Sequence, residues 1–229
     1  MISIIIPVLN EAKTIKALLF HLIDHAALSS ISEIIVVDGG STDETKEIIQ
    51  SLDLGIVLLD SEKGRAKQMN TGAKIAKGNI LYFLHADSFP PNRYDKLILN
   101  EVEKGNKAGC FRMQFDNNHW WLRIVSWLTQ FSWRACRGGD QSQFITRELF
   151  DEIGGYDENY IIYEDNILIN ELYARNEFVV INRKLKTSAR MYKKHGVWKV
   201  QYHFCIIYIK KWCGASADEM LAYYKKHLC

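Results

Sequence analysis

The chain has 229 residues, of which 48% are hydrophobic and 24% charged, and this mixture is typical of a soluble globular protein. The length suits one large domain, or one domain with a smaller appended part. The formal net charge is only +2, and neither a run of Lys and Arg nor a nucleic-acid-binding motif accompanies it, so we expect no nucleic-acid partner.

Five cysteines are scattered along the chain without a CxxC pair, which argues against a zinc site. Their odd number, and the lack of a basic segment before the first apolar run, lead us to expect reduced thiols in a cytoplasmic protein. That first apolar run is far too short to span a bilayer.

Short apolar runs alternate with amphipathic stretches in the first half of the chain. We expect strands at 3–6, 33–37, 56–59 and 80–84, and helices at 11–28, 46–52 and 66–77. This alternation predicts βαβ units in an α/β fold with a mostly parallel sheet, in which ligands bind just beyond the carboxyl ends of the strands. Polar or turn-forming segments follow three of these strands, at 7–11, 38–43 and 85–87, and we expect them to meet in one crevice.

The second half of the chain has a less regular pattern. We expect strands at 108–115, 143–146 and 178–181, and helices at 119–137, 164–175, 197–212 and 216–228. Two Gly-Gly pairs, at 138–139 and 154–155, interrupt these elements as turns.

Two acids stand at the ends of apolar strands. Asp87 follows 80–84 and could be an oxygen ligand for Mg²⁺ or Mn²⁺, with His85 as a direct or outer ligand; alternatively, Asp87 caps the next helix. Asp38 ends 33–37 before Gly39 and Gly40, a position where an acid commonly hydrogen-bonds a nucleoside. The alternative for Asp38 is a strand end followed by a turn and a Ser/Thr helix cap, with Ser41 and Thr42 as the capping residues.

Further candidates begin two of the expected helices. Arg65 could contact a base or a phosphate, or simply begin a solvated helix. Glu164 and Asp165 could complement a helix dipole, or one of them could be a general base toward an acceptor hydroxyl. Neither GxGxxG nor GxxxxGK[ST] occurs, which disfavours dinucleotide cofactors and P-loop chemistry.

Five segments together resemble family 2 glycosyltransferases of the GT-A fold. They are SIIIPVLNEAKTI, EIIVVDGGSTDET, GRAKQMNTGAKIAKGNILYFLHAD, GGYDE and YEDN, in the order and spacing of that family, and the resemblance runs from residue 2 to about residue 180. The run TSARMYKKHGVW and the GGDQ run at 138–141 are similar to a compact bacterial subgroup. The resemblance implies a GT-A domain at 1–182, with a nucleotide-sugar-binding half (1–90) and an acceptor half (91–182), and a helical extension at 183–229.

The resemblance also implies roles for individual residues. Those expected to bind the nucleotide are Pro7, Asn10, Glu11, Asp38, Arg65 and Ala86. Those expected near the diphosphate or the acceptor are Asp140, Gln141, Arg190 and Lys194. Asp87, with His85, would hold a divalent cation. Asp165, with Glu164 beside it, would be the catalytic base of an inverting transfer to an acceptor that is either a small molecule or lipid-linked.

Two departures from the family pattern bear on this activity. His85 stands where the family has the first acid of its DxD motif, which leaves metal dependence open. No QxxRW motif occurs, so we expect a non-processive enzyme, with a UDP-linked sugar as the default donor. A GT-A nucleotidyltransferase is a rival, disfavoured because residues 7–11 are not a Gly-rich basic loop; a non-enzymatic nucleotide-sugar-binding protein is another.

Aromatic residues are concentrated at 119–133 and 197–212, where basic residues accompany them. Such helices can lie in a membrane interface, which would make the protein peripheral to the inner membrane face. We favour packing on the sheet or on a second subunit of a homodimer, because buried aromatic residues are commoner than membrane anchors.

Overall fold

The structure is a computed structural model that describes residues 1–138 and 141–228. Its strands are β1 (Ile2–Val8), β2 (Ile31–Asp38), β3 (Val57–Asp60), β4 (Ile80–Phe83), β5 (Ser88–Phe89), β6 (Ala108–Phe115), β7 (Gln143–Thr146) and β8 (Val179–Thr187). Its α-helices are α1 (Ile15–Asp24), α2 (Thr45–Ser51), α3 (Arg65–Ile75), α4 (Tyr94–Glu103), α5 (Trp120–Leu128), α6 (Arg147–Ile153), α7 (Glu164–Ala174), α8 (Arg190–His195), α9 (Val197–Trp212) and α10 (Ala217–Leu228). Short 3₁₀ turns lie at Leu28–Ser30 and Arg134–Cys136.

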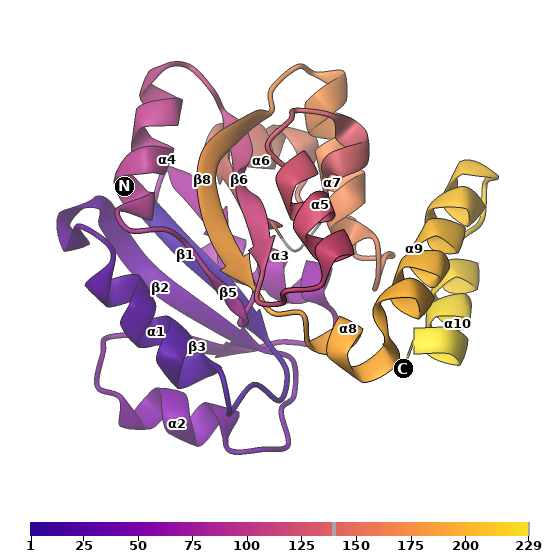
Figure 1. Ribbon diagram of the computed structural model, residues 1–229. Coiled ribbons are helices and arrows are strands. Elements are labelled where there is room, and N and C mark those ends of the chain that lie inside the picture. The colour runs from indigo at the N-terminus through magenta and orange to yellow at the C-terminus, as the bar shows by residue number, and fades with distance from the viewer. Residues whose placement is uncertain (139–140, 229) are drawn as a thin grey trace.

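The described strands form one eight-stranded sheet in the order β3-β2-β1-β4-β7-β6-β8-β5 (Figure 1). Strands β1 to β4 are parallel to one another, as expected from the βαβ pattern. Strand β7 is antiparallel to both β4 and β6, whereas β8 runs parallel to β6. The expected α/β class is therefore confirmed, and the second half of the chain makes the sheet a mixed one.

Helices cover both faces of the sheet, because the sheet is apolar on both sides. On β1, Ile4 and Ile6 join a cluster that packs against α1, α2 and α4, whereas Ile5 faces α3, α6 and α7. This division follows from the two-residue period of a strand. All seven residues of β1 are buried, which explains the continuous apolar run in the sequence.

The aromatic helix α5 ends at Leu128, so the expected helix through residue 137 is wrong. The Thr129 side chain accepts the N–H of Met113 at 2.9 Å and donates to the carbonyl of Ser126 at 2.7 Å, which fixes the chain against β6. The buried Arg137 then donates to the carbonyls of Thr129 and Phe131 at 2.6 and 2.8 Å. These bonds occupy backbone groups that a longer helix would have needed.

The C-terminal part begins on the sheet and ends as a helical pair. Strand β8 continues to Thr187, well past the expected end at 181, so regular helix begins only at Arg190. Helices α9 and α10 pack against each other and project from the side of the sheet (Figure 1). The division into domains at 182 and 183 falls inside β8 and stays a prediction.

Candidate active site

The segments after β1 and β2 are joined by side-chain hydrogen bonds. The backbone N–H of Asn10 donates to Ser41 Oγ at 2.8 Å, and Asn10 Oδ1 accepts the N–H of Thr42 at 2.8 Å. Helix α2 begins only at Thr45, whose N–H is bonded by Asp43, so the expected capping role of Ser41 and Thr42 is wrong. Their polar groups hold the turn after β1 instead.

Asp38 ends β2 and is only 1% exposed. Its Oδ2 accepts the backbone N–H groups of Gly40 and Ser41, each at 2.9 Å. Its Oδ1 is buried and has no hydrogen-bond partner among the described residues. Because a buried carboxylate oxygen without a partner is costly, this oxygen is suited to a donor group supplied by a ligand.

Gln68 on α3 is a residue that the sequence did not single out. Its Nε2 donates to the carbonyls of Val8 and Val37, at 2.8 and 2.7 Å, and so ties the ends of β1 and β2 together. A Cβ at Gly39 would lie 2.9 Å from this amide, so a larger residue there would push Gln68 away from its two carbonyl partners. A polar residue on the buried side of a helix was the only available signal.

Arg190, at the start of α8, bridges the ends of β1 and β4. Its two terminal nitrogens donate to the Glu11 carboxylate at 2.9 and 2.6 Å, a bidentate pair, and its Nε lies 3.3 Å from Asp87 Oδ2. The arginine side chain is 59% exposed, whereas the two carboxylates are largely buried. The structure thus brings together three of the residues expected from the sequence, with a cation between the two acids.

Asp165 lies at the N-terminus of α7, across from the end of β4. Its Oδ2 is 3.9 Å from Nε2 of His85, and both residues line a small cavity of about 10 Å³ together with Tyr156. Burial raises the pKa of Asp165 above its ordinary value, and the Coulombic influence of Arg65 opposes that rise. The Tyr156 hydroxyl is also buried, with its pKa raised by burial and by Asp165 and Glu164. A carboxylate so placed is suited to accept a proton.

Glu164, beside Asp165, is fully buried and forms an ion pair with Arg65, whose Nε lies 2.7 Å from Glu164 Oε1. Arg65 begins α3, so this pair joins the α3 side of the crevice to the catalytic-base candidate on α7. The pair neutralises one of two adjacent buried acids, which leaves Asp165 as the candidate base.

The remaining predicted residues have different surroundings. Pro7 and Ala86 are buried in β1 and after β4, and Lys194 is exposed on α8. Gln141 is buried in a network in which its oxygen accepts from Arg137 at 2.8 Å and its nitrogen donates to the carbonyl of Cys136 at 2.7 Å. In the described structure its amide is therefore bound to protein groups rather than open toward the crevice. Asp140 lies outside the described residues.

A divalent cation fits this site only through a sparse protein ligand set. Among residues 1–138 and 141–228 no group of three or more His, Cys, Asp or Glu side chains is arranged to hold a metal. Asp87 offers one partly accessible carboxylate beside Glu11, and both already face a positive charge, that of Arg190. One carboxylate with substrate phosphates as the other ligands is a common arrangement for Mg²⁺.

Comparison with known protein families identifies the family of this chain. Residues 3–157 match the family described as Glycosyl transferase family 2. The chain belongs to this family. The family 2 chain is 37% identical over 98 residues to glycosyltransferase AglE of Haloferax volcanii (41% of this chain, 32% of the relative). It is 33% identical over 177 residues to a PGL/p-HBAD biosynthesis glycosyltransferase of Mycobacterium bovis (72% of this chain, 66% of the relative).

Solved structures with a similar fold include two glycosyltransferases. TarS of S. aureus in complex with UDP aligns with a TM-score of 0.66 at 19% identity, over 82% of this chain and 60% of TarS. The mannosyltransferase PcManGT of Pyrobaculum calidifontis, in complex with GDP-Man and Mn²⁺, aligns with a TM-score of 0.69 at 19% identity, over 90% of this chain and 61% of PcManGT. The family 2 chain has the GT-A fold that the motifs predicted, and it spans less than two thirds of the length of these proteins.

Proposed function

We propose that the protein is a glycosyltransferase that moves a sugar from a nucleotide-sugar donor to an acceptor hydroxyl, with inversion at the anomeric carbon. The donor occupies the crevice at the carboxyl ends of β1, β2 and β4. Family membership supports the activity, and the complexes of TarS with UDP and of PcManGT with GDP-Man support this class of donor. A UDP-linked sugar is the first donor to test.

One observation carries the proposal: contacts join the ends of β1 and β4 to each other, and the end of β4 lies beside a buried acid. Glu11 and Asp87 share Arg190, and His85, two residues before Asp87, lies 3.9 Å from Asp165. On the other side of β1, the unpartnered Oδ1 of Asp38 offers an acceptor to a ribose hydroxyl or a base N–H.

In the proposed reaction, Asp165 takes the proton of the acceptor hydroxyl as its oxygen attacks the anomeric carbon. The bond from that carbon to the diphosphate oxygen breaks, and the nucleoside diphosphate leaves from the opposite face. Arg190 and Lys194, both on α8, supply positive charge toward the leaving diphosphate. Arg190 exchanges at least one of its carboxylate partners for the diphosphate when the donor binds.

A divalent cation, Mn²⁺ or Mg²⁺, is part of the proposal, with Asp87 as its protein ligand and His85 as a direct or outer ligand. When bound, such a cation neutralises negative charge that develops on the diphosphate. The Mn²⁺ complex of PcManGT supports this cofactor class.

The acceptor is proposed only as a hydroxyl compound, either small or lipid-linked. Two relatives carry a lipid phosphate in their names, an undecaprenyl-phosphate 4-deoxy-4-formamido-L-arabinose transferase of Aeromonas hydrophila and a dolichol-phosphate mannosyltransferase of Pyrococcus furiosus. Both are under two thirds covered by this chain, at 46% and 29% of their lengths.

The function is tested by the release of nucleoside diphosphate from a panel of UDP-, GDP- and dTDP-sugars, with Mn²⁺, Mg²⁺ or chelator. Release above the uncatalysed rate with at least one donor is the expected result, because water can take the place of the acceptor hydroxyl as the nucleophile. Thermal shift with the same ligands reports binding separately, because a ligand that binds only the folded state raises the melting temperature. A panel in which no donor is bound or consumed would overturn the proposal.

A further inference from the structure

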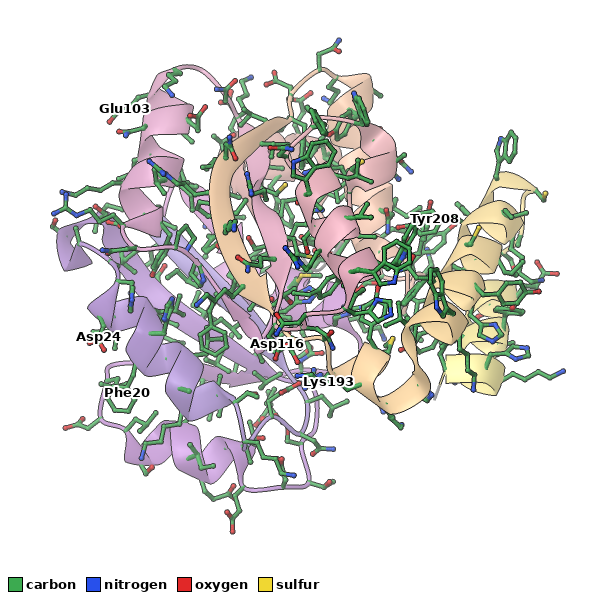
Figure 2. The ribbon with its side chains drawn as sticks, in the orientation of Figure 1. Phe20, Asp24, Glu103, Asp116, Lys193 and Tyr208 are labelled. Atoms are coloured by element: carbon green, nitrogen blue, oxygen red, sulfur yellow. The ribbon has the colours of Figure 1, made fainter. Side chains whose placement is uncertain are left out.

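The helix α9 has three distinct faces, and two of them are packed. It buries Val200, His203 and Ile207, and His203 is hydrogen-bonded to the Tyr223 hydroxyl of α10 at 2.8 Å. Toward the sheet, Tyr208 donates to Asn166 Oδ1 at 3.4 Å, and the ammonium of Lys211 lies 4.6 Å from the ring centroid of Tyr160. Tyr208 is labelled on this inner side in Figure 2.

The third face of α9 is apolar and exposed. It presents residues 198, 202, 205, 209 and 212, which follow one another at helical spacings of three or four. Trp198, Tyr202 and Ile209 are 56%, 61% and 46% exposed, and Trp212 is 89% exposed. So much exposed aromatic area along one helix face is unusual for a surface that contacts only water.

Helix α5 has a matching exposed face. Trp120, Ile124 and Trp127 are 56%, 42% and 54% exposed, whereas Leu122 and Ser126 on its other side are buried against the sheet. The inner side of this helix packs on the sheet, one of the two alternatives favoured from the sequence, whereas its three exposed residues are not covered by the sheet. The two exposed faces join where the rings of Trp120 and Trp198 lie 5.9 Å apart.

The two segments that carry this surface have a positive net charge, and the nearest acids in the chain, Asp218 and Glu219, follow at the start of α10. Residues 178–217 contain nine Lys or Arg and no Asp or Glu, and residues 117–138 contain three Arg and no acid. Exposed cations close to the apolar residues in the chain include Arg123 on α5 and Lys199 on α9. A symmetric contact with a second copy would set this positive surface against itself, whereas an anionic lipid surface complements it.

We propose that the aromatic surface formed by Trp120, Ile124, Trp127, Trp198, Tyr202, Ile209 and Trp212 docks the protein onto an anionic phospholipid bilayer. The aromatic rings enter the interfacial region, and the surrounding Lys and Arg contact the lipid headgroups. The helices lie on the bilayer: within the described residues, none is long and apolar enough to cross it. This inference concerns where the protein acts and is independent of the proposed transfer chemistry.

Docking would also orient the candidate active site. The packed side of α9 touches Asn166, the residue after Asp165, through Tyr208. The helix that lies on the bilayer therefore contacts the N-terminus of α7, which carries the proposed base. Docking would therefore place the N-terminus of α7 on the side of the protein that faces the bilayer, where it could meet an acceptor hydroxyl close to the bilayer surface.

The test is flotation of the purified protein with vesicles of phosphatidylcholine, with or without about one third phosphatidylglycerol. The wild-type protein is expected to float with the anionic vesicles, and less so at high salt, because added ions screen the attraction. Replacing two exposed rings, Trp198→Ala and Trp212→Ala together, is expected to weaken the partition about tenfold or more. The charge reversals Arg123→Glu and Lys199→Glu are expected to weaken binding to the anionic vesicles specifically.

Phe20→Ala is the matched control, because Phe20 is a 40% exposed aromatic residue on α1, far from α9 (Figure 2). It is expected to float as the wild-type protein does. Circular dichroism and nucleoside diphosphate binding check that each variant is folded, and flotation needs neither donor nor acceptor, so its failure is distinct from failure of the proposed function. The inference is overturned if the wild-type protein does not float, if the double Trp variant floats equally well, or if light scattering shows a dimer that Trp212→Ala dissociates.

Discussion

The unpartnered oxygen of Asp38 gives a quantitative prediction for donor binding. In Asp38→Asn, the amide oxygen can keep the bonds from the N–H groups of Gly40 and Ser41, which places the NH₂ where Oδ1 stood. A ribose hydroxyl or base N–H that donates to Oδ1 would then meet another donor. Loss of one hydrogen bond to a charged acceptor costs about 1.5–3 kcal/mol, so the Kd for a nucleoside diphosphate should rise roughly 10- to 150-fold.

Isothermal titration with UDP and GDP measures this change. The matched control is Asp60→Asn, which makes the same substitution at the end of the neighbouring strand β3, where the carboxylate is 73% exposed and paired with Lys46. Its effect on Kd is expected to be small, since exposed ion pairs contribute little. If Asp38→Asn folds normally and binds nucleoside diphosphates as tightly as the wild-type protein, the assignment of Asp38 to the donor is refuted.

Three further predictions concern the base, the bridging arginine and the core. Burial raises the pKa of Asp165, so the transfer rate should begin to fall at a higher pH, on acidification, than it would with an ordinary aspartate as the base. The same shift means that the folded state loses stability as pH rises through the folded pKa of Asp165, because the buried group is then ionised. Asp165→Asn should therefore raise Tm at neutral pH, and an unchanged Tm would count against this. Arg190→Ala leaves the largely buried carboxylates of Glu11 and Asp87 without their shared cation, so it should lower the free energy of unfolding by about 1–3 kcal/mol in urea unfolding. It should also tighten Mn²⁺ binding at Asp87 without donor and weaken nucleoside diphosphate binding, both measured by titration calorimetry. Gly72→Ala places a Cβ 2.6 Å from Ile5 Cγ2 and should destabilise by about 1–3 kcal/mol in urea unfolding, and a neutral effect would contradict the tight packing of α3 on β1.

The first half of the fold could be predicted because the residue pattern of each strand by itself indicates how the strand is buried. A parallel strand that is covered on both faces has to be apolar along most of its length. In the sequence, β1 and the second part of β2 are such apolar runs. The residues directly after those strands were then brought to one edge by topology alone. This rule indicates Asp38 and Asp87 as site residues without the help of the family resemblance.

The second half was harder because long-range contacts decide it. The aromatic residues after Leu128 continue a helical spacing, yet Arg137 takes the carbonyls of Thr129 and Phe131, and no local signal marks these bonds. The extra length of β8 comes from its pairing with β6 over residues 109–115.

Within the site, the least predictable feature was the pairing of distant charges. Arg190 and Glu11 are 179 positions apart, and the sequence indicated only that each was polar and near a turn. The pairing of Arg65 with Glu164 likewise depends on how α3 and α7 pack. The family motifs indicated roles for these residues but not their partners.

The proposed function depends most on Asp165 as the base of a sugar transfer from a bound nucleotide sugar. The direct measurement is the rate of donor turnover in Asp165→Asn, compared with its donor Kd, with Asp151→Asn, an exposed acid on α6, as control. If Asp165 is the base, kcat should fall roughly 10²–10⁴-fold, Kd should stay near that of the wild-type protein, and the control should be unchanged. Turnover by Asp165→Asn at the wild-type rate would contradict it.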